Sequence, residues 1–445
     1  MGRSWLVLGA IGLAAAGCGP AKSPHPASTA GRNACAELPR TKAAPHRELQ
    51  AELALVEQER GLPLQVDPTA RDAPADTDEL TPARLLIRAF PPFSRALVLG
   101  QLDEIYRGGP LALSPVQLER GRELLRRQAQ AAHDFRQALP ATGRGFGVRL
   151  ADGVLADLEF LDPLAIGCRL EGVGAAVALA DNRPDDALPH FEVMLRAARL
   201  LAAEPNVTMR VAAANIRGDA LHVLSAIATH DQASRETHEQ LFAVLALQTA
   251  DWPDDARAWH GDRAAGLLVY ELVRDGQYLS LLSQAEMKAL EEQRIVRVTA
   301  KAVMRKLDDD ELFYLRAMRQ MLAACQQPYA ERQEVLRQIR GELAARESSA
   351  DYPLVAGTIL LADFEHGHRR QAEDFARSQA WLLALGTALG REPAAPPINP
   401  LTGQPYAVEV TPLSVVVSGV LDERDTTYVV PRVAAPTPDR VGRQP

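Results

Sequence analysis

The sequence predicts a mainly α-helical protein, an array of antiparallel helical hairpins of tetratricopeptide-like texture, with a small C-terminal β element. Three observations support this prediction. The 445-residue chain is rich in Ala, Leu and Arg, which are strong helix formers. Apolar residues recur at helical spacing from about residue 46 to 390. After Arg391 the chain changes to prolines and short runs of β-branched residues, which are typical of turns and strands.

The beginning of the chain has the pattern of an export signal. Arg3 supplies a positive charge, and residues 5–17 form an apolar stretch that is too short to span a bilayer. Ala15, Ala16 and Gly17 then precede Cys18, which resembles the lipobox of bacterial lipoproteins, although Ala15 stands where that family usually has Leu. The resemblance implies cleavage between Gly17 and Cys18 and lipidation of Cys18, with acyl chains such as palmitate. The alternative is an ordinary secretory signal that contains Cys18 by chance.

A lipidated Cys18 would hold the protein on the cell membrane or the outer membrane, with its soluble part outside the cytoplasm. After the signal peptide 1–17, residues 18–45 are rich in Pro, Ala, Ser and Lys and are expected to form a disordered tether. We expect no later apolar run of transmembrane length. The expected helical domain covers 46–390, the β-like tail 391–433 and a disordered end 434–445.

Capping signals place several helices within this domain. Ser114-Pro115-Val116-Gln117 is a helix start with a hydroxyl cap, and Ser283–Glu286 opens a second helix that runs to about Lys306. Gly390 is placed to end a late helix. We expect roughly a dozen helices. The apolar stripe behind the first cap comprises Leu118, Gly121, Leu125, Ala132, Phe135 and Leu139, and the late stripe comprises Ala372, Phe375, Gln379, Leu382, Gly386 and Leu389.

Two segments leave alternatives open. Around Asp152-Gly153 the alternating apolar residues fit either a β-hairpin or a restarted helix. Residues 166–229 look like consecutive helical hairpins, and Ala187 and Phe191 resemble the second helix of a tetratricopeptide unit. The unit does not recur at a fixed period, so we predict an array-like fold rather than a tetratricopeptide protein.

The tail is expected to form three short strands, because β-branched residues gather there after a proline-rich stretch. The predicted strands are Tyr406–Val410, Leu413–Ser418 and Thr427–Pro431.

The most distinctive string in the chain is Asn399-Pro-Leu-Thr-Gly-Gln-Pro-Tyr406, followed by Val417-Ser418-Gly419 and acidic residues. It resembles the Asp-Pro-Phe-Thr-Gly-Lys-Pro box at the end of large, uncharacterised helical exported proteins of planctomycete and related bacteria. Residues 185–205 and 259–263 also resemble the helical body of that family, although only the tail box is specific. The resemblance implies a helical body with a small tail, and it implies no activity.

The same ending is similar to that of type II secretion pseudopilins, in which acidic residues of the last loop bind calcium. The matching residues are Asp422 and Asp425, whose oxygens would suit Ca²⁺. Asn399 replaces the usual Asp of those proteins, and Arg424 lies inside the loop. A solvated acidic turn is therefore the alternative, and calcium is the one candidate cofactor of this chain.

Two further groups of residues could carry chemistry. His366 and His368 flank Gly367, and both imidazoles would reach one metal ion only if Gly367 breaks the helix; the alternative is a solvent-facing turn between helices. The other group, on one expected helix, combines the residue types of general acid-base catalysis, although helical proteins carry such polar faces routinely. It comprises Asp255, His260, Asp262 and Arg263.

Other patterns favour structural roles. The Gly143–Gly147 segment opens no clear βαβ unit, so it is a weak phosphate loop, and Asn206-Val207-Thr208 matches a glycosylation sequon by chance. Residues 308–311 are acidic and are expected to cap the following helix. With Cys18 lipidated, Cys35, Cys168 and Cys325 remain; Cys168 and Cys325 could pair, or could be two buried thiols.

Composition narrows the classes of function. A formal net charge of −8, with arginines scattered among acidic residues, lacks the basic patch that nucleic acid requires. We find no catalytic signature, and the preferred hypothesis is a non-enzymatic, lipid-anchored envelope scaffold that binds a protein or peptide. The alternatives are a hydrolase or metal-dependent enzyme that uses the histidines and aspartates, and a calcium-stabilised accessory protein of secretion or envelope assembly.

Overall fold

The structure is a computed structural model that describes residues 46–59, 81–106, 111, 113–140, 146, 156, 158–276, 304–347, 349, 351–391, 393, 395, 397–421 and 427–432. Several predictions lie outside these residues: the lipidated Cys18 with its signal peptide and tether, the hairpin or helix at Asp152-Gly153, the helix from Ser283 and the acidic loop at Asp422 and Asp425.

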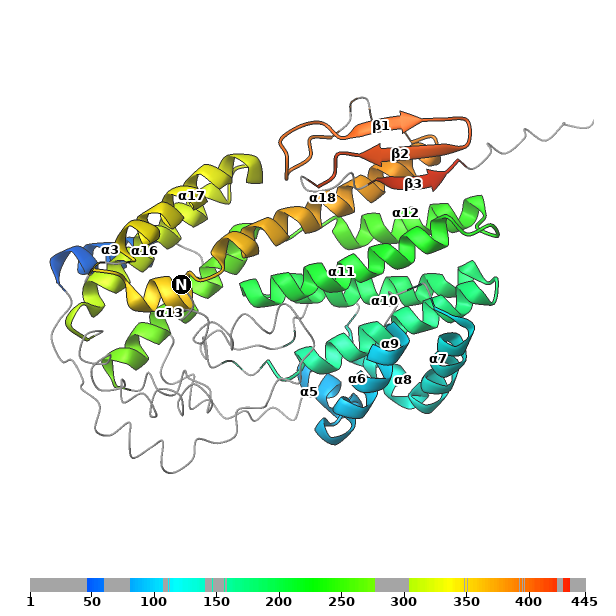
Figure 1. Ribbon diagram of the computed structural model, residues 1–445, viewed down its shortest axis with the longest axis horizontal. Helices are drawn as coiled ribbons and strands as arrows, with labels where there is room; N and C mark the ends of the chain where they lie inside the picture. The colour runs from blue at the N-terminus through cyan, green and yellow to red at the C-terminus, as the bar shows by residue number, and fades with distance from the viewer. Residues whose placement is uncertain are drawn as a thin grey trace, which may run out of the picture.

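The predicted mainly helical class is confirmed within the described residues, which contain 13 α-helices and a short π-helix (Figure 1). The helices are α3 (Arg47–Gln58), α5 (Pro82–Ala89), α6 (Pro92–Tyr106), α7 (Pro115–Arg127), α8 (Ala129–Ala138), α9 (Leu161–Ala180), α10 (Pro184–Ala202), α11 (Val207–Ala228), α12 (Arg235–Thr249), α13 (Asp255–Arg274), α16 (Leu307–Ala324), α17 (Tyr329–Arg346), η3 (Ala356–Leu360) and α18 (Phe364–Ala388).

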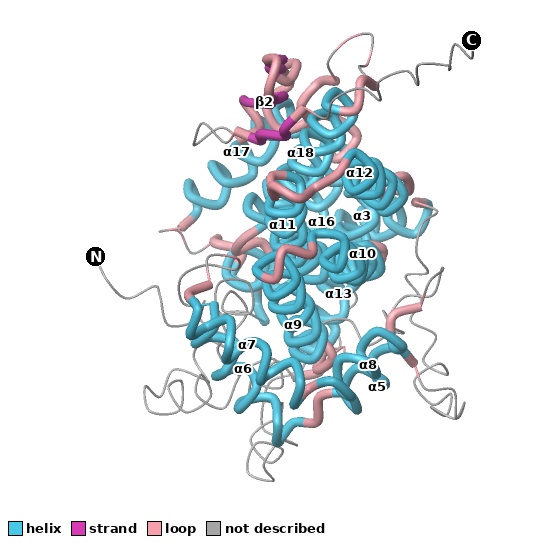
Figure 2. The backbone as a smooth tube through the Cα atoms, turned by 90° about the vertical axis from the view of Figure 1, so that its right-hand side faces the viewer, coloured by secondary structure: helices cyan, strands magenta, loops and turns pink. Residues whose placement is uncertain are grey.

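Helices α9, α10 and α11 form the centre of the molecule, and α18 packs on α11 and α12 (Figure 1). Short connections bring α9 beside α10 and α10 beside α11, as the hairpin prediction for residues 166–229 requires. Helices α5 to α8 pack around α9 (Figure 2), while α3, α13, α16 and α17 lie at the other end of the molecule (Figure 1). Ala187 and Phe191 of α10 are fully buried in this core.

The capping signals are confirmed where they are described. Ser114 and Gln117 form the predicted capping box of α7, in which each side chain accepts a backbone N–H of the other residue. Gly390 adopts a φ of +77° directly after α18, and Arg391 N donates to Gly386 O across it, which ends the helix. Asn206, the first residue of the sequon, caps α11 by accepting from Met209 N.

Two predicted apolar stripes needed correction. The first predicted stripe spans two helices, because the helix is interrupted at Gln128, between α7 and α8. The second describes only part of α18, since Phe375, Gln379 and Leu382 are partly exposed. The side chains of α18 that are at most 2% exposed are Phe364, His368, Gln371, Ala376, Ser378, Ala380, Trp381, Ala384 and Leu385. Elements cover this helix on more than one side, so a single stripe cannot describe it.

Helix α9 is long and apolar enough to span a bilayer by length and composition, so the expectation of no later apolar run of transmembrane length is wrong. In the structure 72% of its most apolar stretch is buried inside the protein. Helices α6, α7, α8, α10 and α11 all pack against it. Its composition therefore fits a core helix that is mostly buried by neighbouring helices.

The C-terminal sheet confirms the three predicted strands. β1 (Ala407–Val410), β2 (Ser414–Ser418) and β3 (Tyr428–Pro431) pair antiparallel in the order β1-β2-β3. Val415 and Val417 of β2 are fully buried, and β2 and β3 pack on α18 (Figure 1). The alternating side chains of β2 thus give the sheet one face towards the helical body.

Candidate functional site

Two arginines on α11 organise a buried polar region that we call the arginine junction. Arg210 and Arg217 are seven residues apart, so their side chains leave the same face of the helix. They are only 3% and 1% exposed. The junction comprises these two residues with Trp252, Asp255, Arg332 and Asp374.

Asp255, at the beginning of α13, joins two of the arginines. One carboxylate oxygen accepts from Arg210 at 2.9 Å, and the other accepts from Arg332 of α17 at 2.8 Å. Arg332 also donates to the backbone oxygens of Gln327 and Cys325, at 2.6 and 3.0 Å. This arrangement ties α11, α13 and α17 to the end of α16 through charge-assisted hydrogen bonds.

Arg217 forms the other half of the junction. It pairs with Asp374 of α18, and its guanidinium carbon lies 4.5 Å from the centroid of the Trp252 ring, over which Arg210 also lies at 5.6 Å. Burial lowers the pKa of Arg217 and raises the pKa of Asp374, although each partner's charge opposes the shift of the other. The centroids of the Trp252 and Phe375 rings are 4.8 Å apart, so two packed aromatic rings lie beside the Arg217–Asp374 ion pair.

A second group, the histidine cluster, adjoins the junction through Arg332. His368 is fully buried, and its ring stacks on Trp259 at 4.1 Å between centroids. Its Nδ1 lies 4.0 Å from Cys325 Sγ, and Trp259 Nε1 donates to Gln371 Oε1 at 3.1 Å. The cluster thus joins α13, the end of α16 and α18.

The protonation states of the histidine cluster are those of neutral groups. Burial, followed by the charge of Arg332, lowers the pKa of His368 to about 3, and burial raises the pKa of Cys325 to about 12. A nucleophilic Cys–His pair needs a lowered thiol pKa so that the thiolate can form. Here the environment favours the opposite states, a protonated thiol beside an uncharged imidazole.

Of the four residues of the predicted acid-base group, His260 and Arg263 contact each other, whereas Asp255 and Asp262 bind other parts of the protein. Asp255 belongs to the arginine junction. Arg263 pairs with Glu59 after α3 and contacts His260 Nδ1 at 3.1 Å, while Asp262 accepts from Val207 N at 3.0 Å. The helix spacing that suggested a common face therefore separates these groups among three different neighbours.

The predicted pair of histidines does not converge. Helix α18 runs unbroken through Gly367, so His366 is exposed whereas His368 is buried. The condition under which both imidazoles would share an ion is therefore not met, and the expected solvent-facing turn is wrong. Among the described residues no group of three or more His, Cys, Asp or Glu side chains could hold a metal ion. Asp422, Asp425, Gly17 and Cys18 lie outside those residues.

Cys168 and Cys325, for which a disulfide remained open, are both free and buried. The acidic run has divided roles. Asp308, Asp309 and Asp310 all lie in the first turn of α16, where acidic residues oppose the helix dipole, but no side chain caps the helix by a hydrogen bond. Asp310 instead accepts from the backbone nitrogens of Val355 and Ala356.

One titratable cluster has no counterpart in the sequence analysis. Glu171 of α9 is 2% exposed and accepts two hydrogen bonds from Arg136, at 2.7 and 2.6 Å, and one from His190 Nδ1 at 2.5 Å. Burial raises the pKa of Glu171, but the hydrogen bonds from Arg136 and His190 outweigh it and leave the pKa lowered. The three residues lie on α8, α9 and α10, so only helix packing brings them together.

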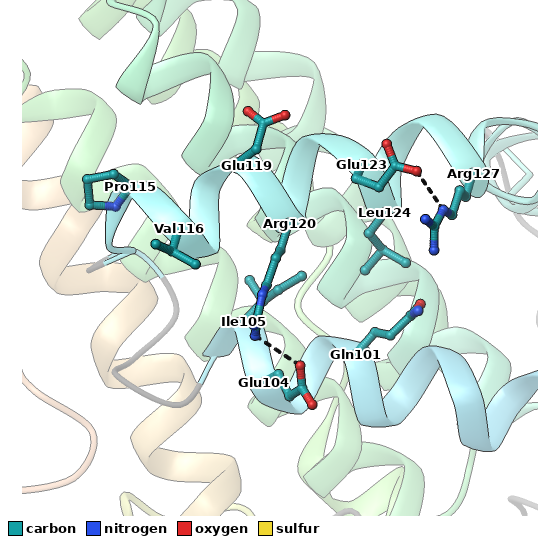
Figure 3. Close-up of a pocket in the computed structure, with 10 residues that line it drawn as sticks. All are labelled: Gln101, Glu104, Ile105, Pro115, Val116, Glu119, Arg120, Glu123, Leu124 and Arg127. Carbon is teal, nitrogen blue, oxygen red and sulfur yellow. Dashed lines mark hydrogen bonds and ion pairs between the residues drawn. The ribbon is translucent and has the colours of Figure 1, made fainter.

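The helix pair α6 and α7 forms a surface groove of about 740 Å³ (Figure 3). Ile105, Leu124 and Val116 provide apolar surface, while ion pairs between Arg120 and Glu104 and between Arg127 and Glu123 lie along it (Figure 3). Both signs of charge therefore occur in the groove.

Comparison with known proteins found no matching family model, no matching curated protein and no matching solved structure. The fold and these sites define the protein as a helical-array protein with a small antiparallel sheet, a buried arginine junction and an open groove between two helices.

Proposed function

We propose that this protein is a lipid-anchored, non-enzymatic scaffold of the cell envelope, and that it binds an amphipathic helix of a partner protein in the α6–α7 groove. The single observation that carries the binding role is a set of large apolar side chains on α6 and α7, the two helices that form the groove, that no described residue covers. Phe93, Leu97 and Val116 are 88%, 67% and 64% exposed.

The geometry of α6 favours a helix as the occupant. Phe93 and Leu97 are four residues apart and therefore lie one turn apart on the same side of α6. Gly100 follows on that side, and a side-chain carbon added there would meet nothing within 4 Å. The large side chains form a ridge on α6, and the open space at Gly100 forms a groove beside it. Two helices pack when the ridge of each fits into the groove of the other.

The charges of the groove define the chemistry of the partner. Three carboxylates and two guanidinium groups line it, from Glu104, Glu119, Glu123, Arg120 and Arg127. A complementary helix would bury apolar residues at i and i+4 against Phe93 and Leu97 and place charges of both signs at its edges.

The neutral thiol and imidazole of the histidine cluster support the non-enzymatic part of the proposal, because the chain uses them as packed and hydrogen-bonding groups. The anchor is supported by the signal and the small residues before Cys18.

Site-specific photocrosslinking in intact cells tests the groove. A crosslinking residue at Leu97 should give one defined adduct, and the mass of its partner peptide should identify an amphipathic helix. The same residue at Leu247 of α12, which is 63% exposed, is the matched control and should not give that adduct. An adduct from both positions, or none from Leu97, would contradict the groove as the binding site.

The intact mass of the native protein tests the anchor. We expect a chain that begins at Cys18 and carries added acyl mass, and we expect Cys18→Ala to move the protein from the membrane fraction to the soluble fraction. A retained leader, or an unmodified thiol at Cys18, would contradict the envelope assignment without affecting the groove.

A further inference from the structure

The arginine junction contains more positive than negative charge. Three buried guanidinium groups, of Arg210, Arg217 and Arg332, face two carboxylates, of Asp255 and Asp374, among the residues that the structure describes. Beside them on α18, two further arginines, Arg370 and Arg377, contact the carboxylate of Glu373. This excess is unusual in a chain whose formal net charge is −8, and burying an uncompensated charge costs free energy.

Two of these guanidinium groups also have nitrogens without a hydrogen-bond partner. Arg210 Nη1 and Arg217 Nε are buried, and neither has an acceptor within the described part of the chain. Leaving a buried donor without an acceptor costs free energy, so such groups normally bind an anion or ordered water.

The two donors belong to one place in the fold. Both guanidinium groups lie over the Trp252 ring, at 5.6 and 4.5 Å from its centroid, so their central carbons are at most about 10 Å apart. The Asp374 carboxylate interacts electrostatically with Arg217 and with three further arginines, which are Arg210, Arg370 and Arg377. Trp252, Arg370 and Arg377 are partly exposed, which gives the junction an edge towards solvent.

We propose that the arginine junction binds an oxyanion, a phosphate or carboxylate group, which accepts hydrogen bonds from Arg210 and Arg217 beside the Trp252 ring. The bound group supplies negative charge, which balances the positive charge that remains after the arginines pair with Asp255 and Asp374. Arginine is suited to this role because its planar donors match the oxygens of both groups. The site is separate from the α6–α7 groove, and the proposal does not depend on the groove or on the lipid anchor.

Thermal unfolding of the full mature chain tests the proposal. Inorganic phosphate is added at constant ionic strength against sodium chloride, because a ligand of the native state raises the unfolding midpoint with its concentration. We expect a saturable rise of about 2–4 °C. Acetate in place of phosphate distinguishes the two sources: a rise with acetate alone assigns a carboxylate ligand, and a rise with phosphate assigns a phosphate group.

Matched variants locate the effect. Arg210→Gln removes one of the two free donors and should abolish the rise, whereas Arg126→Gln, on the exposed face of α7, should keep it. If Arg210→Gln does not fold, Arg370→Gln at the solvent edge should weaken the apparent affinity about three- to tenfold. No rise with either anion, which would mean that ordered water fills the site, overturns the proposal, and so does an equal rise in the wild type and Arg210→Gln.

Discussion

Asn399, the first residue of the tail box, occupies a position that requires an amide and not a carboxylate. The side chain is fully buried; Nδ2 donates to Gly419 O at 2.9 Å and Val420 O at 3.1 Å, and Oδ1 accepts from Leu401 N at 2.9 Å. A carboxylate could not donate either of the first two hydrogen bonds. The distinctive tail box therefore connects the loop after α18 to the end of β2.

Replacing Asn399 with Asp should lower the free energy of unfolding by about 2–4 kcal/mol, because two buried carbonyl groups lose their donor and a charge enters the site. Urea unfolding at pH 7 measures this change. Gln404→Glu, the same exchange at an exposed position of the same turn, should change stability by less than about 0.5 kcal/mol. Equal effects of both exchanges would contradict the assigned role of Asn399.

His368 and Asp262 make stability depend on pH in opposite directions. The pKa of His368 falls from 6.5 to about 3, so the stability that its neutral form contributes is present above pH 6.5 and is lost as the pH falls towards 3. Burial raises the pKa of Asp262 from 3.8 to about 6, so its contribution is present below pH 3.8 and is lost as the pH rises towards 6.

His368→Phe should weaken the loss of stability on acidification, because phenylalanine can keep the ring against Trp259 but cannot bind a proton. Between pH 6.5 and 4 we expect the slope of unfolding free energy against pH to fall by up to about 1.4 kcal/mol per pH unit, the value for one proton. Urea midpoints across this range measure it. His366→Asn, at an exposed position of the same helix, should leave the slope unchanged.

Asp262→Asn should stabilise the protein at pH 7 by about 1–2 kcal/mol, since the amide oxygen can still accept from Val207 N and no charge is buried. The difference should shrink as the pH falls and should disappear at about pH 3, where the wild-type carboxyl is mostly protonated in both states. Urea unfolding at pH 7 and at about pH 3 checks both statements, and a destabilised variant at pH 7 would show that the carboxylate is required there.

Helix α13 approaches the beginning of α11 so closely that it requires a residue without a side chain. A Cβ atom at Gly261 would lie 1.6 Å from the backbone oxygen of Pro205. This contact sets Asp262 close enough to accept from Val207 N at the start of α11, where the helix dipole favours an acceptor. Gly367 of α18 has a similar role, because a Cβ atom there would meet Val207 at 2.9 Å.

Gly261→Ala should therefore destabilise the protein by more than about 3 kcal/mol, since backbone cannot move aside as a flexible side chain can. Gly341→Ala in α17 is the control: nothing lies within 4 Å of the added carbon, and we expect about 0.5–1 kcal/mol of stabilisation from helix propensity. Thermal unfolding of both variants distinguishes close packing at Gly261 from a general intolerance of alanine.

The tail sheet and the helical body share one core. Tyr406 donates from its hydroxyl to Ala376 O inside α18 at 2.9 Å, and Tyr428 of β3 packs on Trp381 at 4.8 Å. Tyr329 N at the start of α17 donates to Pro400 O at 3.0 Å. Since the sheet covers α18 and α18 covers α11, we expect the tail and the body to unfold together.

Val417→Ala, in the fully buried face of β2, should lower the midpoint of one common transition by an amount that corresponds to about 1–3 kcal/mol. Far-UV circular dichroism and tryptophan fluorescence should report the same midpoint. Val429→Ala, at a site that is 42% exposed, should have a much smaller effect. Two separate transitions would show instead that the tail unfolds on its own.

Local sequence signals predicted the beginning of α7, the end of α18 and the three strands, because caps and β-branched alternation act within a few residues. They also suggested that Asp255 and His368 belong to polar sites. They could not place Arg217 beside Asp374 or Arg136 beside Glu171, because residues far apart in sequence meet only when helices pack. The helical class was thus decided by short-range preferences, whereas the arginine junction, the neutral state of His368 and the open face of α6 follow from packing, which alone sets the distances and burial on which their chemistry depends.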